Sequence, residues 1–195
     1  MKVYHGTIKK YALNIWTRGI TLNFSDESAD FGKGFYTSTK PAFAEITVIN
    51  KSEKLLARRD KFKYNNSYNP EDYIPYVVVF EFDGSIKPLD FEVADLKWFQ
   101  FVVNNRNGYY YVRKVGETFH NLQSEFDIVR GPIADGDIVN VVNQLLFINR
   151  KANASDLIGM PFPVNTDTQI SFHTVEAFKT LAKCDYYEVG GDKDE

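Results

Sequence analysis

YVVVFEF, residues 76–82, is the stretch of this sequence that decides the fold, because it is a run of β-branched and aromatic residues interrupted only by Glu81. Such side chains favour the pleated surface of a buried strand. We therefore predict a central strand over Tyr76–Phe82. The residues on its two sides are typical of connections: Tyr64–Pro75 is rich in Asn, Tyr, Ser and Pro, and Asp83-Gly84-Ser85 predicts a turn.

Outward from this strand, short strands and helices alternate along the chain. Further strands are predicted at Val3–Thr7, Gly34–Ser38, Ile86–Phe91, Phe126–Val129 and Gln169–His173. Helices are predicted at Ile8–Arg18 with an end near Gly19, from Pro41 onward, at Ala94–Asn104, at Ile138–Ile148, and after a cap at Thr174. The order lacks the regular βαβ rhythm of a parallel sheet, so we predict an α+β fold with mostly antiparallel strands.

The composition excludes several classes of protein. With 195 residues and a formal charge of −3, the chain is expected to form one domain over residues 1–190, followed by an acidic tail at 191–195. The single cysteine, Cys184, cannot form an internal disulfide, and with three scattered histidines it does not suggest a metal site. Because no signal peptide or membrane span is visible, we expect a cytoplasmic protein without a membrane partner.

Three short motifs carry residue types suited to chemistry. Tyr4-His5-Gly6-Thr7 ends the first predicted strand, although a histidine there is on its own more often a structural residue. The segment Asp30-Phe-Gly-Lys-Gly-Phe-Tyr-Thr-Ser38 places two glycines before an aromatic pair, which a plain hairpin would also do. In Gln169–His173 the alternation puts Gln169, Ser171 and His173 on one face, as a half-buried edge strand would.

Together these motifs resemble the histidine-tyrosine class of ADP-ribosyltransferases, which includes diphtheria toxin and the poly(ADP-ribose) polymerases. The chain is similar, more closely, to a bacterial domain family long labelled as of unknown function and placed in that superfamily. This similarity rests on Asp30–Tyr36, Trp98–Arg106, Asp127-Ile-Val-Arg-Gly-Pro-Ile-Ala-Asp135 and Gln169–Thr174, and it spans about residues 1 to 183. It implies an ADP-ribosyltransferase-like fold with split β-sheets and peripheral helices.

The resemblance also implies a binding site for NAD as co-substrate. His5 would bind a ribose hydroxyl, the backbone of Gly6 would bind the nicotinamide carboxamide, and Tyr36 would stack on the nicotinamide ring. His5, Tyr36 and Gln169 are the expected catalytic residues. The wider NAD-binding set comprises His5, Gly6, Thr7, Gly34, Phe35, Tyr36, Phe43 and Arg106.

This sequence departs from the family pattern in two places. Ala44 stands where the polymerases have a carboxamide-binding serine, and no second stacking tyrosine follows, so Phe43 is the candidate substitute. Gln169 stands where the superfamily usually has a glutamate. A glutamine can hold a ribose hydroxyl but cannot take a proton, so another acid such as Glu125 or Asp127 would have to contribute, unless the acceptor is already nucleophilic.

Two basic features have both a functional and a structural interpretation. Asn104-Asn105-Arg106 offers an arginine for a pyrophosphate, but it is also an ordinary helix end. Residues 51–63 hold six basic and two acidic side chains, with Tyr64, Tyr68 and Tyr73 nearby, and would suit RNA or DNA. A solvated helix face is the more common explanation of such a run.

The leading hypothesis is a mono-ADP-ribosyltransferase that cleaves the nicotinamide–ribose bond of NAD and transfers ADP-ribose to RNA, DNA or protein. By analogy with the family it would be the toxin of a toxin–antitoxin or phage-defence pair, with an antitoxin partner. The alternative is a non-catalytic module that binds NAD, ADP-ribose or a partner protein. A third hypothesis, phosphate transfer from RNA to NAD, lacks an evident set of arginines.

Overall fold

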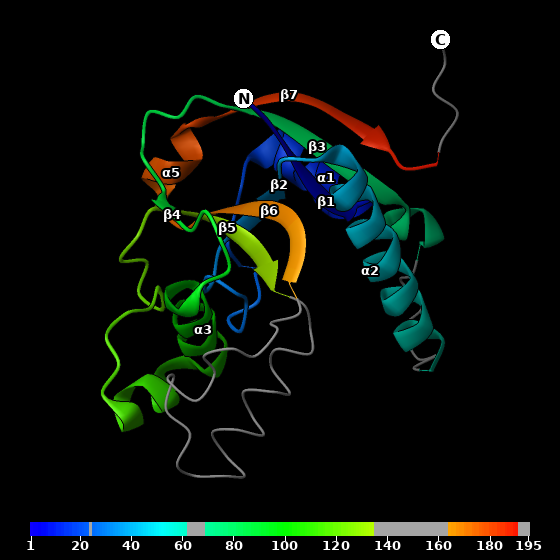
Figure 1. Cartoon of the computed structure of the whole chain (residues 1–195). Coiled ribbons are helices and arrows are strands. Elements are labelled where there is room, and N and C mark those ends of the chain that lie inside the picture. Colours follow the sequence, from blue (N-terminus) through cyan, green and yellow to red (C-terminus); the bar gives the residue numbers. More distant parts are fainter. Residues whose placement is uncertain (24, 62–68, 135–163, 191–195) are drawn as a thin grey trace. The chain divides into compact units, whose positions relative to one another are not determined.

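Strands β1 (Lys2–Ile8), β3 (Pro75–Phe82) and β7 (Leu181–Glu188) form the antiparallel centre of the first half of the fold (Figure 1). The computed structural model describes residues 1–23, 25–61, 69–134 and 164–190. They fall into two units, which we describe one at a time. The first unit comprises Met1–Thr21, Thr37–Ser85 and Lys179–Glu195, and the second comprises Leu22–Tyr36 and Ile86–Phe178.

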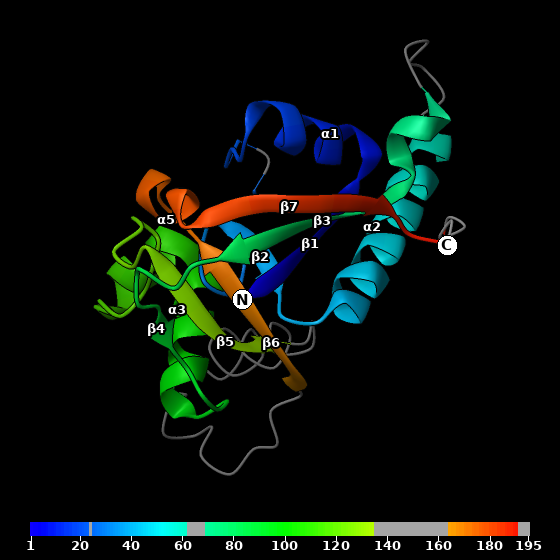
Figure 2. The same cartoon turned by 90° about the horizontal axis from the view of Figure 1, so that it is seen from above.

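In the first unit the strand order is β2-β1-β3-β7, and every neighbouring pair is antiparallel. Strand β2 (Phe35–Ser38) joins through Ser38, which lies opposite Tyr4 of β1. Figure 2 shows β3 lying between β1 and β7. The prediction of a central strand over Tyr76–Phe82 is therefore confirmed, and its five buried residues, Val77–Phe80 and Phe82, explain the apolar run.

Two helices cover opposite faces of these strands. Ala44 and Val48 of α2 (Pro41–Lys61) pack on Val77 and Val79 of β3. On the other face Trp16 of α1 (Lys9–Arg18) lies against Tyr186, with ring centroids 4.8 Å apart, and Tyr186 is the partner of Val78. Because neighbouring residues of a strand point to opposite sides, the two helices enclose the strands between them.

Two predicted helix boundaries in this unit are confirmed, whereas the first helix begins at Lys9 rather than Ile8. Helix α1 ends at Gly19, whose backbone N–H donates to the carbonyl of Ile15 at 3.0 Å in a conformation with φ +92°. Helix α2 begins at Pro41, the position where a missing N–H costs nothing. The predicted loop Tyr64–Pro75 contains a short 3₁₀ helix, Pro70–Tyr73, and residues 62–68 lie outside the described part.

The second unit contains strands in the order β4-β5-β6. Strand β5 (Ile128–Ala134) pairs in parallel with β4 (Leu89–Asp90) and antiparallel with β6 (Val164–Phe172), with a register shift between Pro132 and Ile133. Helix α5 (Val175–Lys179) is capped by Thr174, whose hydroxyl accepts from the N–H of Ala177 at 3.1 Å. This cap agrees with the sequence prediction.

Helix α3 (Leu96–Val115) anchors an aromatic core in this unit. Asp95 caps its first turn, and Trp98, fully buried, donates its indole N–H to the carbonyl of Pro132 at 3.2 Å. Around it Phe31, Phe91 and the phenylalanines of α3 form one cluster of buried rings. The core therefore ties the glycine-rich segment before β2 to the helix and to β5.

Several elements differ from the predictions. Only Leu89–Asp90 of the predicted strand Ile86–Phe91 pairs as a strand, since Pro88 beside it has no N–H to donate. Strand β5 begins at Ile128 rather than Phe126 and continues to Ala134. Helix α3 extends beyond Asn104 to Val115 and is broken at Gly108, whose φ is +73°.

Strand β7 was not predicted, and the predicted helix Ile138–Ile148 lies outside the described residues. The α+β class with mostly antiparallel strands is confirmed by the strand pairings within each unit. Within the described residues, no helix combines the length and the apolar character that crossing a membrane requires.

Candidate functional site

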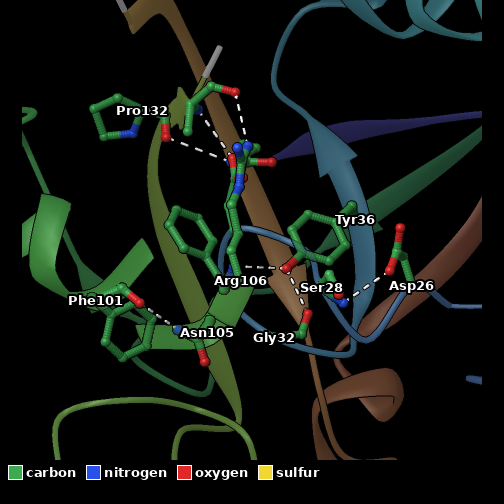
Figure 3. Close-up of polar contacts among 12 residues, drawn as sticks. Asp26, Ser28, Gly32, Tyr36, Phe101, Asn105, Arg106 and Pro132 are labelled. Atoms are coloured by element: carbon green, nitrogen blue, oxygen red, sulfur yellow. Dashed lines mark hydrogen bonds and ion pairs between the residues drawn. The ribbon is translucent and has the colours of Figure 1, made fainter. Parts of the chain in front are cut away.

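Tyr36 is held by the glycine turn that precedes it. Its hydroxyl donates to the carbonyl of Gly32 at 2.7 Å and accepts from the N–H of Phe31 at 2.9 Å, as Figure 3 shows for Gly32. Gly32 has φ +85°, so the turn requires a residue without a side chain there. Burial, and then the nearby charge of Asp30, raise the pKa of Tyr36 well above its usual value. The phenol is therefore neutral and its ring has one orientation.

Asp30, at the start of the same turn, is the centre of a buried polar network. One carboxylate oxygen forms an ion pair with Arg106 of α3, including a hydrogen bond from Nε at 2.7 Å. The other accepts from the backbone N–H of Ala134 at 3.0 Å and from the Gln169 side-chain amide at 2.7 Å. Figure 3 shows the Arg106 side chain extending to this network beside Pro132. One carboxylate thus joins the glycine turn, α3, β5 and β6.

This network determines how Gln169 is oriented. Its Nε2 faces two acceptors, the Asp30 carboxylate and, at 3.5 Å, the carbonyl of Pro132. Since neither group can donate, the amide must present its N–H bonds to them. The carbonyl oxygen consequently points the other way, and it forms no hydrogen bond with a described residue. A hydroxyl donor is the natural partner for that oxygen.

His173 and Ser171 complete the polar face of β6. His173 Nδ1 lies 2.9 Å from the carbonyl of Lys33, so Nδ1 must carry the proton and donate it. Nε2 is then the acceptor for the Ser171 hydroxyl, 2.8 Å away. Burial lowers the pKa of His173 to about 4, which keeps the ring neutral.

Gly34 has a packing role beside this histidine. A Cβ at Gly34 would lie 2.6 Å from His173 Cε1, closer than packed atoms approach. The His173 ring also meets Tyr36 edge to face at 6.4 Å. Gln169–His173 is not a half-buried edge strand, because both of its faces are buried. Its polar side chains form their hydrogen bonds within the protein. His173 therefore holds the segment that leads to Tyr36.

The structure places the predicted site residues in both units. Tyr36, Gln169, Arg106, Gly34 and Phe35 belong to the second unit, and the first three are connected through Asp30 and the turn that follows it. Phe35 is buried.

His5, Gly6, Thr7 and Phe43 belong to the first unit. Thr7 is buried, and a Cβ at Gly6 would lie 2.3 Å from the carbonyl oxygen of Ala44. Gly6 is thus needed where α2 approaches β1. A single cleft shared by His5, Tyr36 and Gln169 stays a prediction.

The carboxylate bonded to Gln169 is Asp30, which the sequence motif contains but to which no role was assigned. Of the two acids proposed instead, Asp127 accepts a hydrogen bond from the Thr174 hydroxyl, and Glu125 lies 3.4 Å from His120 Nδ1. The structure shows neither of them bonded to Gln169. The only available signal for Asp30 was its place directly before the Phe-Gly pair.

The basic run 51–63 is only partly described. Lys51 and Lys54 are exposed on α2, as a solvated helix face requires, although partial desolvation by the surrounding chain lowers the pKa of Lys51. Tyr64 and Tyr68 lie outside the described residues, and the carbonyl of Tyr73 accepts from the Ser52 hydroxyl at 2.6 Å.

Comparison with known proteins identifies one family. A family model described as "Protein of unknown function (DUF3990)" matches residues 1–182. No curated protein and no solved structure matches the chain. The predicted similarity to a domain family of unknown function is confirmed, and membership of the ADP-ribosyltransferase superfamily stays a prediction.

Proposed function

The chain belongs to the DUF3990 family of proteins of unknown function, and from its site we propose that it is an NAD-dependent mono-ADP-ribosyltransferase. The observation that carries this proposal is the arrangement in the second unit. Asp30 bonds to Arg106 and Gln169, and the turn that begins at Asp30 holds the Tyr36 ring in place. Arg106, Gln169 and Tyr36 are three of the residues that the family resemblance independently selects for NAD.

Each of the three offers what this substrate needs. The neutral, oriented ring of Tyr36 suits stacking on the planar nicotinamide. The side-chain carbonyl of Gln169, opposite its bonded amide nitrogen, can accept a hydrogen bond from a ribose hydroxyl, and the Arg106 guanidinium is the usual type of partner for a pyrophosphate. Arg106 is, however, already paired with Asp30, so any contact with phosphate would have to use guanidinium N–H groups that this ion pair does not engage.

In the proposed reaction the bond between the nicotinamide nitrogen and ribose C1′ breaks, and nicotinamide leaves with the electron pair. An acceptor oxygen or nitrogen attacks C1′ and releases a proton. The oxocarbenium-like transition state carries positive charge on the ribose. Gln169 supplies a carbonyl dipole there, while the charge of Asp30 stands one hydrogen bond behind it. The acceptor's proton has to pass to solvent or to the acceptor's own surroundings.

The test is release of nicotinamide from NAD labelled in either the nicotinamide or the adenylate part, with and without cell lysate. We expect Tyr36→Leu to abolish release and Tyr36→Phe to reduce it less, because the phenyl ring can still stack although it lacks the two hydrogen bonds that orient Tyr36. Gln169→Leu is expected to slow release by about 10²-fold or more. Gln123→Leu, a change at an exposed glutamine, is the matched control.

Transfer of the adenylate label to protease- or nuclease-sensitive material would identify the acceptor class. A toxin role predicts in addition that expression of the active chain arrests growth and that Tyr36→Leu does not. Unchanged nicotinamide release in Tyr36→Leu and Gln169→Leu would refute the assignment of this site.

A specific observation favours a second candidate, a non-catalytic NAD- or ADP-ribose-binding module. The negative charge of Asp30 is balanced by Arg106, so the network as a whole offers the transition state no net negative charge. Calorimetric titration distinguishes the two functions. NAD binding that requires the Tyr36 ring, without release of nicotinamide under any acceptor condition, would establish the binding module.

A further inference from the structure

The second part of α3, after the break at Gly108, presents an unusual surface. Gly108 has non-helical angles, φ +73° and ψ −174°, so the turn that follows is set off from the first part of the helix (Figure 1). Its sequence is YYYVRK, residues 109–114. Val112 is buried and Tyr111 packs against the aromatic core, which attaches this segment to the second unit.

The other side chains of the segment are exposed, although the Tyr109 ring also meets the His120 ring edge to face, with centroids 6.3 Å apart. Tyr110 is 80% exposed and Tyr109 is 44% exposed, and together with Arg113 and Lys114 they line an open hollow of about 660 Å³. Large rings are costly to leave in water, so two adjacent exposed tyrosines are a feature that a partner would explain.

The cations in this hollow are available for binding. Neither Arg113 nor Lys114 forms an ion pair with a described residue, and the nearby Glu117 already accepts a hydrogen bond from Gln100 at 2.7 Å. Basic residues in a last helical turn do complement the helix dipole. That effect does not account for the exposed rings beside them.

The spacing places one cation next to each ring. Tyr109 and Arg113 are four residues apart, as are Tyr110 and Lys114, and such residues are neighbours on a helix surface. The surface therefore offers two planar rings, each accompanied by a positive charge. A ligand that matches it needs accessible planar groups with negative charges at a similar repeat. An unpaired nucleotide chain has both, whereas the bases of a duplex are covered by their neighbours.

We propose that the surface formed by Tyr109, Tyr110, Arg113 and Lys114 binds single-stranded nucleic acid. Bases stack on the two tyrosines, and phosphates pair with the arginine and the lysine. This binding requires neither NAD nor turnover, and so it is independent of the function proposed above.

The test is fluorescence anisotropy of a short labelled single-stranded oligonucleotide, RNA and DNA in separate arms, with the full chain and no NAD. Tyr110→Ala is expected to weaken binding by about 5- to 150-fold, the usual contribution of one stacked base, and Tyr110→Phe to retain it. Arg113→Gln with Lys114→Gln is expected to make the slope of log affinity against log salt shallower by about 1.4, the value for two phosphate contacts on a single strand.

The matched control is Lys51→Gln with Lys54→Gln, which removes two exposed cations from α2. We expect this variant to bind like the unaltered chain, and urea unfolding checks that every variant is folded. A larger loss in the α2 variant than in the α3 variants would overturn the proposal and place the nucleic-acid surface on α2. Equal competition by a duplex or by an acidic peptide, or absence of binding, would overturn it as well.

Discussion

Replacing Asp30 by asparagine removes the charge at the centre of the buried network while keeping the shape of the side chain. Arg106 then keeps a positive charge in a place where its side chain is only 15% exposed, and the side chain of Asp30 is 9% exposed. Removing one partner of such a pair costs about 3 to 5 kcal/mol, mainly because the remaining charge is buried without compensation. We expect the free energy of unfolding to fall by that amount.

The measurement is urea unfolding followed by the fluorescence of the tryptophans, one of which, Trp98, is buried in the same unit. Asp90→Asn is the matched control, since Asp90 pairs with Arg130 at 3.2 Å with side chains 36% and 46% exposed. An exposed pair of this kind contributes less than about 1 kcal/mol. The contrast between the two variants isolates the effect of burial.

A second variant tests the cause of the loss. If the cost comes from an unpaired charge, Asp30→Asn combined with Arg106→Met will recover part of it, because the double variant has no buried charge. Losses of equal size in Asp30→Asn and Asp90→Asn would refute the reasoning, and so would a double variant that is less stable than both single variants.

Three further predictions concern the residues that support Tyr36. Because burial holds the pKa of His173 at about 4 against 6.5 for the free side chain, the unfolded chain binds the proton more readily between these values. The stability that the neutral ring contributes is therefore present above about pH 6.5 and is lost as the pH falls toward 4. Urea titrations are expected to show a fall of about 3 kcal/mol in the free energy of unfolding over this range, and a His173→Asn variant is not expected to show it. Gly34→Ala places a Cβ against the same ring and is expected to cost about 1 to 3 kcal/mol, less in a His173→Ala background; a fully stable single variant would contradict the packing role. Tyr36→Phe leaves the carbonyl of Gly32 and the N–H of Phe31 without their partner and is expected to lower the free energy of unfolding by about 1 to 3 kcal/mol, whereas an unchanged melting temperature would indicate that water replaces the hydroxyl.

Local signals in the sequence were sufficient to predict the helices and strands whose ends they mark. The run Tyr76–Phe82 lies between two strands with Val77–Phe80 and Phe82 buried, Gly19 ends α1, Pro41 begins α2, and Thr174 caps α5. Each of these features depends on residues within a few positions along the chain. Short-range physics therefore predicts them correctly.

Features that depend on distant partners could not be predicted in this way. Strand β7 has mostly exposed or half-exposed side chains, and its buried and exposed residues do not alternate. It is a strand because it pairs with the edge of β3. The partners of Asp30 lie 76, 104 and 139 residues further along the chain, so no local pattern connects them. Gly108 within an apolar helical pattern was the one local signal for the break in α3 that was overlooked.

The two units are interleaved along the chain, and this order has a consequence for biosynthesis. Ribosomes add residues from the first onward, and domains that are continuous in sequence can fold as they emerge. Here β3 cannot pair with β7 until Leu181–Glu188 has been synthesised. Likewise, Asp30 cannot form its hydrogen bond with Gln169 until that residue has been added. A nascent chain that stops after α3 has Asp30 and Arg106 but neither β6 nor β7. The complete set of residues in this network therefore exists only after Gln169 has been made.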